Sequence, residues 1–289
     1  MSSPSRILVT NDDGIDAPGI QALAAAAAHS GAHVVVAAPV REYSGASASM
    51  SALQDDGRVL LAARDFDGLP DVTAYAVEAS PAFIALIGTR GAFGFSPDFV
   101  LSGVNRGANA GHAVLHSGTV GAALTAAETG CRAIAVSLDV LAASSATVSA
   151  AEAGVSPEDL AAMVARGEVD RHWDTAARLA TGLLKKVNGT PPGTVLNLNV
   201  PDVALENVRG VRRAELARFG QVQVIVAQSG KGYVRMALRE PDVSSETGTD
   251  LALLADGYAT VTPLRSPTAA DDVIVDLAGV DASWSSRWL

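Results

Sequence analysis

The stretch RILVTNDDGIDAPG, residues 6–19, decides the fold of this chain. The residues that follow Arg6 are apolar or β-branched and predict a buried strand. Two adjacent carboxylates, Asp12 and Asp13, come next with a glycine, and Pro18 can occupy the first turn of a helix. The stretch therefore predicts a strand, a tight acidic turn and a helix.

The acidic turn concentrates negative charge at the carboxyl end of the first strand. Two neighbouring carboxylates are unfavourable there unless a cation neutralises them, and hard ions such as Mg²⁺ or Mn²⁺ take oxygen ligands from carboxylates, amides and water. Thr10 and Asn11 could support such a site. The alternative is an Asx-rich loop that only caps the next helix.

Composition limits the classes of function. The 289 residues are 48% hydrophobic, enough for a large core, and the formal net charge of −10 works against non-specific binding to nucleic acid or anionic membranes. A single cysteine, Cys131, excludes an intramolecular disulfide and suits a reducing compartment. The sequence shows no signal-peptide core and no apolar run of the about 18 residues that a membrane span needs, so we predict a cytoplasmic protein.

Strand-like and helix-like segments alternate along the first part of the chain. Helix-like residues 17–30 separate the first strand from a second buried strand at 33–38, and this order predicts a right-handed parallel crossover in an α/β fold. Residues 59–63 and 72–77 predict two further strands, which we place in a hairpin outside the main sheet.

A small-residue loop, residues 41–49, follows the second strand and is expected at the same edge of the sheet as Asp12. The loop is either a flexible connector or a segment that turns a serine oxygen and backbone amides toward the acidic site. Both interpretations stay open at this point.

A second informative stretch, residues 104–123, joins a buried strand at 97–103 to an alanine-rich helix. A Ser-Gly-Thr run at 117–119 precedes the helix, where free amides and hydroxyls form a phosphate-binding site. The serine alone would more often be only an N-cap, but Asn105 and Asn109 just upstream favour phosphate. The stretch has no Walker Gly-Lys-Ser or Gly-Lys-Thr, and no Gly-x-Gly-x-x-Gly follows the first strand.

Taken together, these stretches resemble the SurE family, the stationary-phase survival proteins that act as metal-dependent nucleotide phosphatases. The resemblance rests on blocks that occur in the family's order from about Arg6 to Leu264: LVTNDDGIDAPGI, SGASASM, PDFVLSGVNRGANAG, HSGTVGAALTAAETG, AIAVSL, LNLNVP and TGTDLALLADGYATVTPL. So many blocks in one order make the resemblance highly specific.

The resemblance implies an α/β fold with a Rossmann-like, mostly parallel sheet flanked by helices and a C-terminal β-hairpin extension. It also implies one divalent cation per subunit, Mg²⁺ or Mn²⁺, and hydrolysis of a nucleoside monophosphate at its 5′ or 3′ phosphate. Carried over position by position, the implied metal ligands are Asp12, Asp13, Ser44 and Asn105, the phosphate-binding residues are Asn109, Ser117, Gly118 and Thr119, and the catalytic residues are Asp12, Asn11 and Asn109.

The chain departs from the family pattern beside these residues. The family usually carries acidic residues after the glycine that corresponds to Gly111 and a tyrosine before Ser-Gly-Thr, where this chain has His112 and His116. These changes spare the carried-over ligands and affect pocket shape and base preference. Residues 139–170 exceed the family's usual connection, and their Ala/Ser-rich composition predicts a surface excursion with one short helix.

We divide the chain into an α/β catalytic core, residues 1–200, and an extension, residues 201–289, from which residues 250–264 return to the core. Residues 222–238 of the extension predict two strands around a glycine-containing turn. Such a pair is marginally stable alone and resembles a hairpin that the family uses in contacts between subunits.

The end of the chain carries Trp284 and Trp288 in a polar setting, which predicts a tail that docks on a surface. The alternative is that both tryptophans pack on their own subunit. With the hairpin, the tail leads us to expect a homodimer or a dimer of dimers.

Two other functions stay open at the level of sequence. One is an aspartyl-phosphate phosphatase with Asp12 as its nucleophile, although the common form of that chemistry separates the two carboxylates by one residue and needs a later lysine. The other is a non-catalytic nucleotide-binding or assembly protein on the same fold. A trapped phosphoenzyme would indicate the first, and nucleotide binding without phosphate release would indicate the second.

Overall fold

A computed structural model describes residues 4–66, 68–140, 171–220, 223–239, 246–270 and 272–276 of the chain. The predicted excursion at 139–170 lies outside these residues except for its first two positions. Val222, Trp284 and Trp288 lie outside them as well.

The described residues form the following elements. The strands are β1 Arg6–Thr10, β2 His33–Pro39, β3 Gln54–Asp55, β4 Arg58–Val59, β5 Leu61–Arg64, β6 Thr73–Val77, β7 Phe99–Arg106, β8 Arg132–Asp139, β9 Thr194–Pro201, β10 Val211–Arg213, β11 Gln223–Gly230, β12 Tyr233–Arg239 and β13 Ala259–Arg265. The α-helices are α1 Pro18–His29, α2 Pro81–Thr89, α3 Gly118–Glu128, α6 Trp173–Gly182, α7 Leu184–Val187 and α8 Asp250–Ala255, and the 3₁₀ helices are η1 Gly111–His116 and η2 Leu205–Asn207.

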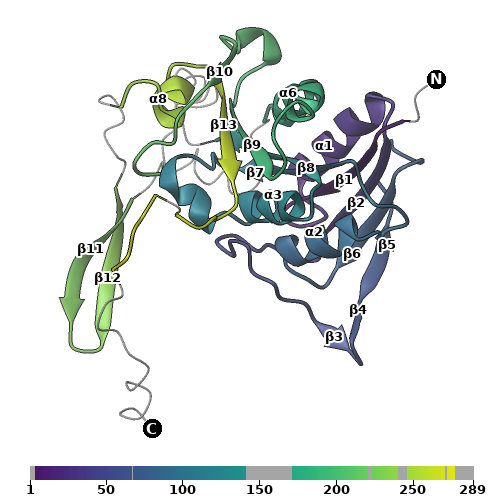
Figure 1. Ribbon diagram of the computed structural model, residues 1–289, viewed down its shortest axis with the longest axis horizontal. Coiled ribbons are helices and arrows are strands. Elements are labelled where there is room, and N and C mark those ends of the chain that lie inside the picture. Colours follow the sequence, from purple (N-terminus) through teal and green to yellow (C-terminus); the bar gives the residue numbers. More distant parts are fainter. Residues whose placement is uncertain are drawn as a thin grey trace, which may run out of the picture.

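A nine-stranded sheet with the order β10-β13-β9-β8-β7-β1-β2-β6-β5 forms the centre of the molecule (Figure 1). The six strands from β9 to β6 in this order are parallel, and antiparallel pairs occur where β13 joins β9 and where β5 joins β6. The predicted α/β fold with a mostly parallel sheet is confirmed. Parallel strands end at one common edge, so the residues after β1, β2, β7, β8 and β9 come together there.

Helices cover both faces of the sheet. Along β1, Ile7 and Val9 belong to a core shared with α1 and α6, whereas Leu8 points into the core shared with α2 and α3. Successive side chains of a strand point to opposite faces of the sheet. Because both faces are covered here, the sequence of the first strand contains a continuous apolar run. The helix predicted at residues 17–30 is α1, and its start at Pro18 uses the fixed φ of proline.

The two strands predicted within residues 59–77 pair antiparallel as a hairpin, but the prediction that this hairpin lies outside the main sheet is wrong. Strand β6 pairs parallel with β2, and β5 pairs antiparallel with β6, so both extend the main sheet. The physical reason is burial: Ala74, Ala76 and Val77 of β6 are buried, and β6 covers the edge of β2 that would otherwise expose unpaired backbone groups. The small β3–β4 pair lies apart from that sheet.

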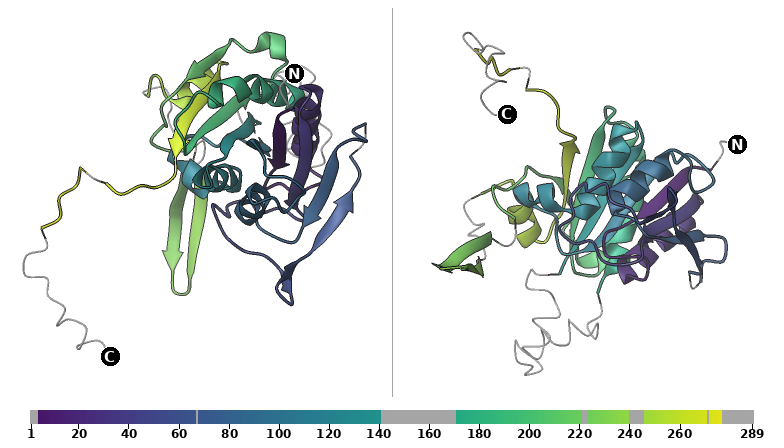
Figure 2. Two further views of the ribbon diagram at one scale, coloured as in Figure 1. Left: turned by 45° about the vertical axis from the view of Figure 1, so that its right-hand side comes forward. Right: turned by 90° about the horizontal axis from the view of Figure 1, so that it is seen from below.

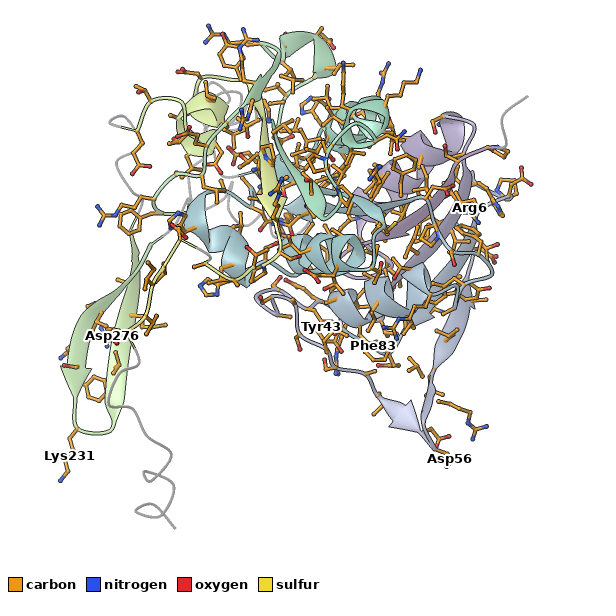
Figure 3. The ribbon with its side chains drawn as sticks, viewed as in Figure 1. Arg6, Tyr43, Asp56, Phe83, Lys231 and Asp276 are labelled. Atoms are coloured by element: carbon orange, nitrogen blue, oxygen red, sulfur yellow. The ribbon has the colours of Figure 1, made fainter. Side chains whose placement is uncertain are left out.

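The predicted C-terminal hairpin is confirmed. Strands β11 and β12 pair antiparallel in a sheet of their own, which projects from the body of the molecule, and Figure 3 shows Lys231 at its tip (Figures 1 and 3). The segment that follows β13 also leads away from the body (Figure 2). Within the described ranges, no helix is long and apolar enough to cross a membrane.

Candidate functional site

The turn after β1 is shaped by Asn11. Its Nδ2 donates to the Gly14 carbonyl at 2.8 Å, and its Oδ1 accepts from the Gly14 amide at 3.2 Å. Asn11 is completely buried, so both ends of its amide are used to close the turn. Asn11 therefore holds the turn closed, with Asp12 and Asp13 in the turn between Asn11 and Gly14.

Asp12 packs against the first turn of α3. The Thr119 hydroxyl donates to Asp12 Oδ1, and the Thr119 backbone amide also bonds the carboxylate. Burial raises the pKa of Asp12, and the charge of Glu42 raises it further, against the hydrogen bonds from Thr119 that lower it. A Cβ at Gly118 would lie 2.7 Å from Asp12 Oδ2 and 2.8 Å from Asp12 Cβ, so only glycine allows this approach.

Asp13 carries an oxygen without a partner. Its Oδ2 is buried and makes no hydrogen bond within the described part of the chain. Burial, and after it the charge of Asp12, raises the pKa of Asp13 to about 7, although a hydrogen bond from the Arg106 backbone opposes the shift. A buried carboxylate oxygen without a donor is costly, and a cation is the ligand that would relieve this cost.

The loop after β2 lies beside this pair of carboxylates. The Tyr43 amide donates to the Asp12 carbonyl at 2.8 Å, and the Ser44 hydroxyl donates to a Glu42 carboxylate oxygen. Figure 3 shows Tyr43 on this loop. The loop is anchored at its other end, because Ser47 Oγ donates to the Leu115 carbonyl at 2.7 Å. The loop is therefore held at the edge near Asp12, and the expectation that a serine oxygen of this loop faces the acidic pair stays a prediction.

Asn105 is at the carboxyl end of β7, next to the residue whose backbone bonds Asp13. Its Nδ2 donates to the Gly107 carbonyl at 2.6 Å, which leaves Oδ1 as the side-chain atom that can meet a cation. The segments that carry Ser44 and Asn105 both contact the acidic turn, through the Tyr43 amide on Asp12 and the Arg106 backbone on Asp13. The predicted ligands offer only oxygen donors, and the described residues contain no group of three or more His, Cys, Asp and Glu side chains arranged for a metal. A hard cation with several bound waters is the ion that such a donor set suits.

Asn109 is held by side chains of β8 and β9. Its amide nitrogen Nδ2 donates to Ser137 Oγ at 2.9 Å, and its backbone bonds the side chains of Asn197 and Asn199 on β9. Sequence reasoning missed both residues of β9. The signal that could have found them is the alternation Leu-Asn-Leu-Asn at 196–199, which puts amides on one face of a fully buried strand.

The Ser-Gly-Thr run forms the start of α3, as predicted. Ser117 is the N-cap, because its Oγ accepts from the Val120 amide at 3.1 Å. Its hydroxyl hydrogen can still be donated to a ligand, since one hydroxyl both accepts and donates. The first turn of α3 therefore supplies backbone amides and the positive end of the helix dipole beside Asp12.

Asp250 anchors the segment between Asn109 and α3, and sequence reasoning missed it too. The buried carboxylate accepts from the Gly111 amide at 2.8 Å and from the Ala217 amide at 2.9 Å. Burial raises the pKa of Asp250, against the backbone hydrogen bonds that lower it. The side chains of His112 and His116 are exposed, and each residue is joined to a neighbouring segment through a backbone hydrogen bond.

Three comparisons with known proteins agree with this architecture. The family model described as Survival protein SurE matches residues 7–223. The chain is 32% identical over 279 residues to a Xanthomonas euvesicatoria protein named 5′-nucleotidase SurE, covering 95% of each chain, and 34% identical over 290 residues to the 5′/3′-nucleotidase SurE of Citrobacter koseri, covering 96% of this chain and 100% of the relative. The crystal structure of the SurE protein from Aquifex aeolicus has a TM-score of 0.69 at 28% identity, covering 93% of this chain and 96% of that one.

Proposed function

This chain belongs to the SurE family, and from this premise we propose that it is a metal-dependent phosphomonoesterase that hydrolyses nucleoside 5′-monophosphates and 3′-monophosphates. The names of its relatives support the nucleotidase activity. One observation carries the proposal for this chain: an acidic pair, made of the buried Asp12 and of Asp13 with its buried, unpartnered oxygen, abuts the amino-terminal turn of α3. This arrangement offers a cation site and an anion site side by side.

The cation-binding residues in this proposal are Asp12, Asp13, Ser44 and Asn105, with one Mg²⁺ or Mn²⁺ per chain. The donor set fits such an ion, because all four side chains offer oxygen and the Asp13 oxygen lacks another partner. When bound, the cation would lower the pKa of a coordinated water and neutralise charge on the phosphate.

The phosphate-binding residues in this proposal are Asn109, Ser117, Gly118 and Thr119. Backbone amides at the start of α3 point to the anion, and the hydroxyls of Ser117 and Thr119 can donate to its oxygens as negative charge develops. In the ligand-free arrangement Thr119 gives its hydroxyl hydrogen to Asp12. Asp12 and the phosphate would thus compete for the Thr119 hydroxyl, so the position of each depends on the other.

Three residues receive catalytic roles. Asp12 orients the attacking water from within the acidic pair, and Asn109 donates an amide hydrogen to a phosphate oxygen. Asn11 acts on the reaction indirectly, because its bonds to Gly14 fix the turn that carries Asp12. All three lie at the carboxyl edge of the parallel strands, where ligands bind in folds of this kind.

We also propose that residues 1–200, with the returning segment 250–264, form the catalytic core. The rest of residues 201–289, in which β10 pairs with β13 at the edge of the sheet, is proposed as an extension that joins subunits into a homodimer or a dimer of dimers. The projecting β11–β12 hairpin supports this assignment, because Val226, Val234 and Met236 are exposed on it. Exposed apolar side chains that gather on one element mark a contact surface.

The test is a phosphate-release panel with nucleoside 5′- and 3′-monophosphates, in EDTA and with Mg²⁺ or Mn²⁺. Release that requires a divalent cation supports the proposal. Nucleotide binding without release at any cation concentration would instead indicate a non-catalytic binding protein. A phosphoenzyme trapped by acid quenching, absent from the Asp12→Asn variant, would indicate an aspartyl-phosphate mechanism.

A further inference from the structure

The backbone of Asn109 is bound on both sides by buried side chains of β9. Its amide nitrogen donates to Asn199 Oδ1 at 2.8 Å, and its carbonyl oxygen accepts from Asn199 Nδ2 at 3.0 Å and from Asn197 Nδ2 at 2.8 Å. A single side-chain amide thus pairs with both polar groups of one peptide residue. This pairing fixes the position and the orientation of the Asn109 backbone.

The register of the sheet connects this pairing to the cation site. Asn105 on β7 is opposite Ser137 on β8, and Ser137 is opposite Asn199 on β9. Residues opposite each other in a sheet point to the same face, and neighbouring strands lie about 4.8 Å apart. Asn105, Ser137 and Asn199 therefore lie in one row of side chains. Asn105 is at one end of this row, and the other two residues hydrogen-bond Asn109.

The two asparagines of β9 are not what core packing alone requires. Both are fully buried, and Asn197 Oδ1 has no hydrogen-bond partner in the described part of the chain. An amide buried with unused capacity costs free energy relative to an apolar side chain of similar size. Such a cost at the edge that carries the candidate site is typical of residues that serve the site.

We propose that Asn199, assisted by Asn197 and Ser137, is a positioning residue that sets the distance between the phosphate-binding amide of Asn109 and the cation-binding residue Asn105. The inference rests on the proposed function, because it assumes that Asn109 meets the phosphate. Asn199 itself contacts neither ligand and acts through Asn109.

The test measures binding of inorganic phosphate to the Mg²⁺-loaded, full-length protein by calorimetry. Asn109→Ala should weaken phosphate binding by roughly tenfold or more, as expected for a lost hydrogen bond to a charged group. Asn199→Ala should have an effect of similar size, and Ser137→Ala a smaller one of the same sign. The affinity for Mn²⁺ should stay within about twofold of wild type in all three, because the cation ligands are untouched.

A double variant separates positioning from general loosening of the fold. If Asn199 acts through Asn109, then Asn199→Ala should add nothing to the phosphate affinity of the Asn109→Ala protein. Thr260→Val is the matched control, because Thr260 is buried opposite Asn199 on β13, and the described structure gives its Oγ1 no partner. The control should keep the wild-type affinity for phosphate.

The possible failures differ. If Asn109→Ala binds phosphate like wild type, the proposed role of Asn109 is wrong and the inference falls with it. If Asn109→Ala weakens binding while the folded Ser137→Ala and Asn199→Ala proteins do not, the inference is overturned and the proposed function stands. Additive losses in the double variant would also overturn it. Should Asn199→Ala fail to fold, Ser137→Ala decides alone, because it removes one hydroxyl and its bond to Asn109 Nδ2.

Discussion

Two regions of this molecule depart from the usual pattern of burial in opposite directions. The carboxyl edge of the sheet buries polar groups, including Asp12 and the unpartnered oxygen of Asp13. The β11–β12 hairpin instead exposes apolar side chains: Val226 is 65% exposed and Met236, directly opposite it, is 64% exposed. Both arrangements cost free energy in the isolated chain.

The difference between the two regions indicates what each one lacks. A buried carboxylate oxygen is satisfied by a cation or a donor, whereas an exposed apolar pair is satisfied by another apolar surface. This contrast supports the proposals that the edge of the sheet binds a small charged ligand and that the hairpin contacts a second protein surface. Changes at one region should affect ligand chemistry and leave assembly intact, and changes at the other should do the reverse.

The largest expected effect is that of Asp12→Asn at the edge. Removing this charge should lower cation-dependent phosphate release by roughly 10³-fold or more. The cation would lose a charged ligand, and the attacking water would lose the carboxylate that orients it. The thermal midpoint of the metal-free protein should stay equal or rise, since a like charge beside Asp13 is gone. Phosphate release and a melting curve check both points, and near-normal release would contradict the assignment of Asp12.

A smaller but clear loss is expected for Gly118→Ala. The new Cβ would lie 2.7 Å from Asp12 Oδ2, so the first turn of α3 must shift away from the acidic pair. We expect a loss of roughly 10²-fold in phosphate release and about 1–3 kcal/mol in the free energy of unfolding. The control is Gly182→Ala at the end of α6, where nothing lies within 4 Å of the new Cβ. The control should be neutral or slightly stabilising, and equal effects of the two changes would remove the special role of Gly118.

A change in the β11–β12 hairpin should affect assembly and leave cation binding unchanged. Met236→Glu places a charge in the exposed apolar face made by Val226, Val234 and Met236, so it should lower the mass seen by light scattering at micromolar protein. Cation affinity should not change. Arg235→Glu on the other face of β12 is the control and should keep the assembly. A wild-type protein that is monomeric at micromolar concentration would rule out the interface.

The smallest expected effect is a dependence of stability on pH, which tests the environment of Asp13 at the edge. The pKa of Asp13 in the folded, metal-free protein is raised to about 7 from an ordinary 3.8. Between these values the folded chain keeps a proton that the unfolded chain has lost, so the free energy of unfolding falls as the pH rises from about 4 to 7. Asp13→Asn removes this loss and should raise the melting temperature at pH 8 by roughly 3–6 °C, with little change at pH 4. A gain that does not depend on pH would contradict the raised pKa.

Much of the fold could be predicted because it depends on local pattern. The β1 turn and the helix after Pro18 have signals within a few residues of each other, and the Ser117 N-cap is equally local. The error at residues 59–77 has a different origin. Pairing of β6 with β2 depends on which strand edge is left uncovered by the rest of the sheet, and no local pattern contains that information.

The candidate site divides in the same way. The acidic pair and the Ser-Gly-Thr run could be found from sequence, because each is contiguous. Asn199 and Asp250 could not, since they reach Asn109 and Gly111 across 90 and 139 positions of the chain. Their partners are set by strand register and by the packing of α8, which only the assembled fold defines.

The most direct test of the cation site is a calorimetric titration of Mn²⁺ into the metal-free, full-length protein. If the acidic edge is incomplete without a cation, one Mn²⁺ should bind per chain. Asp12→Asn and Asp13→Asn should each weaken that binding by more than the roughly 10- to 100-fold that loss of a supporting residue costs. An absence of binding in the wild type, or an unchanged affinity in both variants, would show that these two carboxylates do not hold the cation.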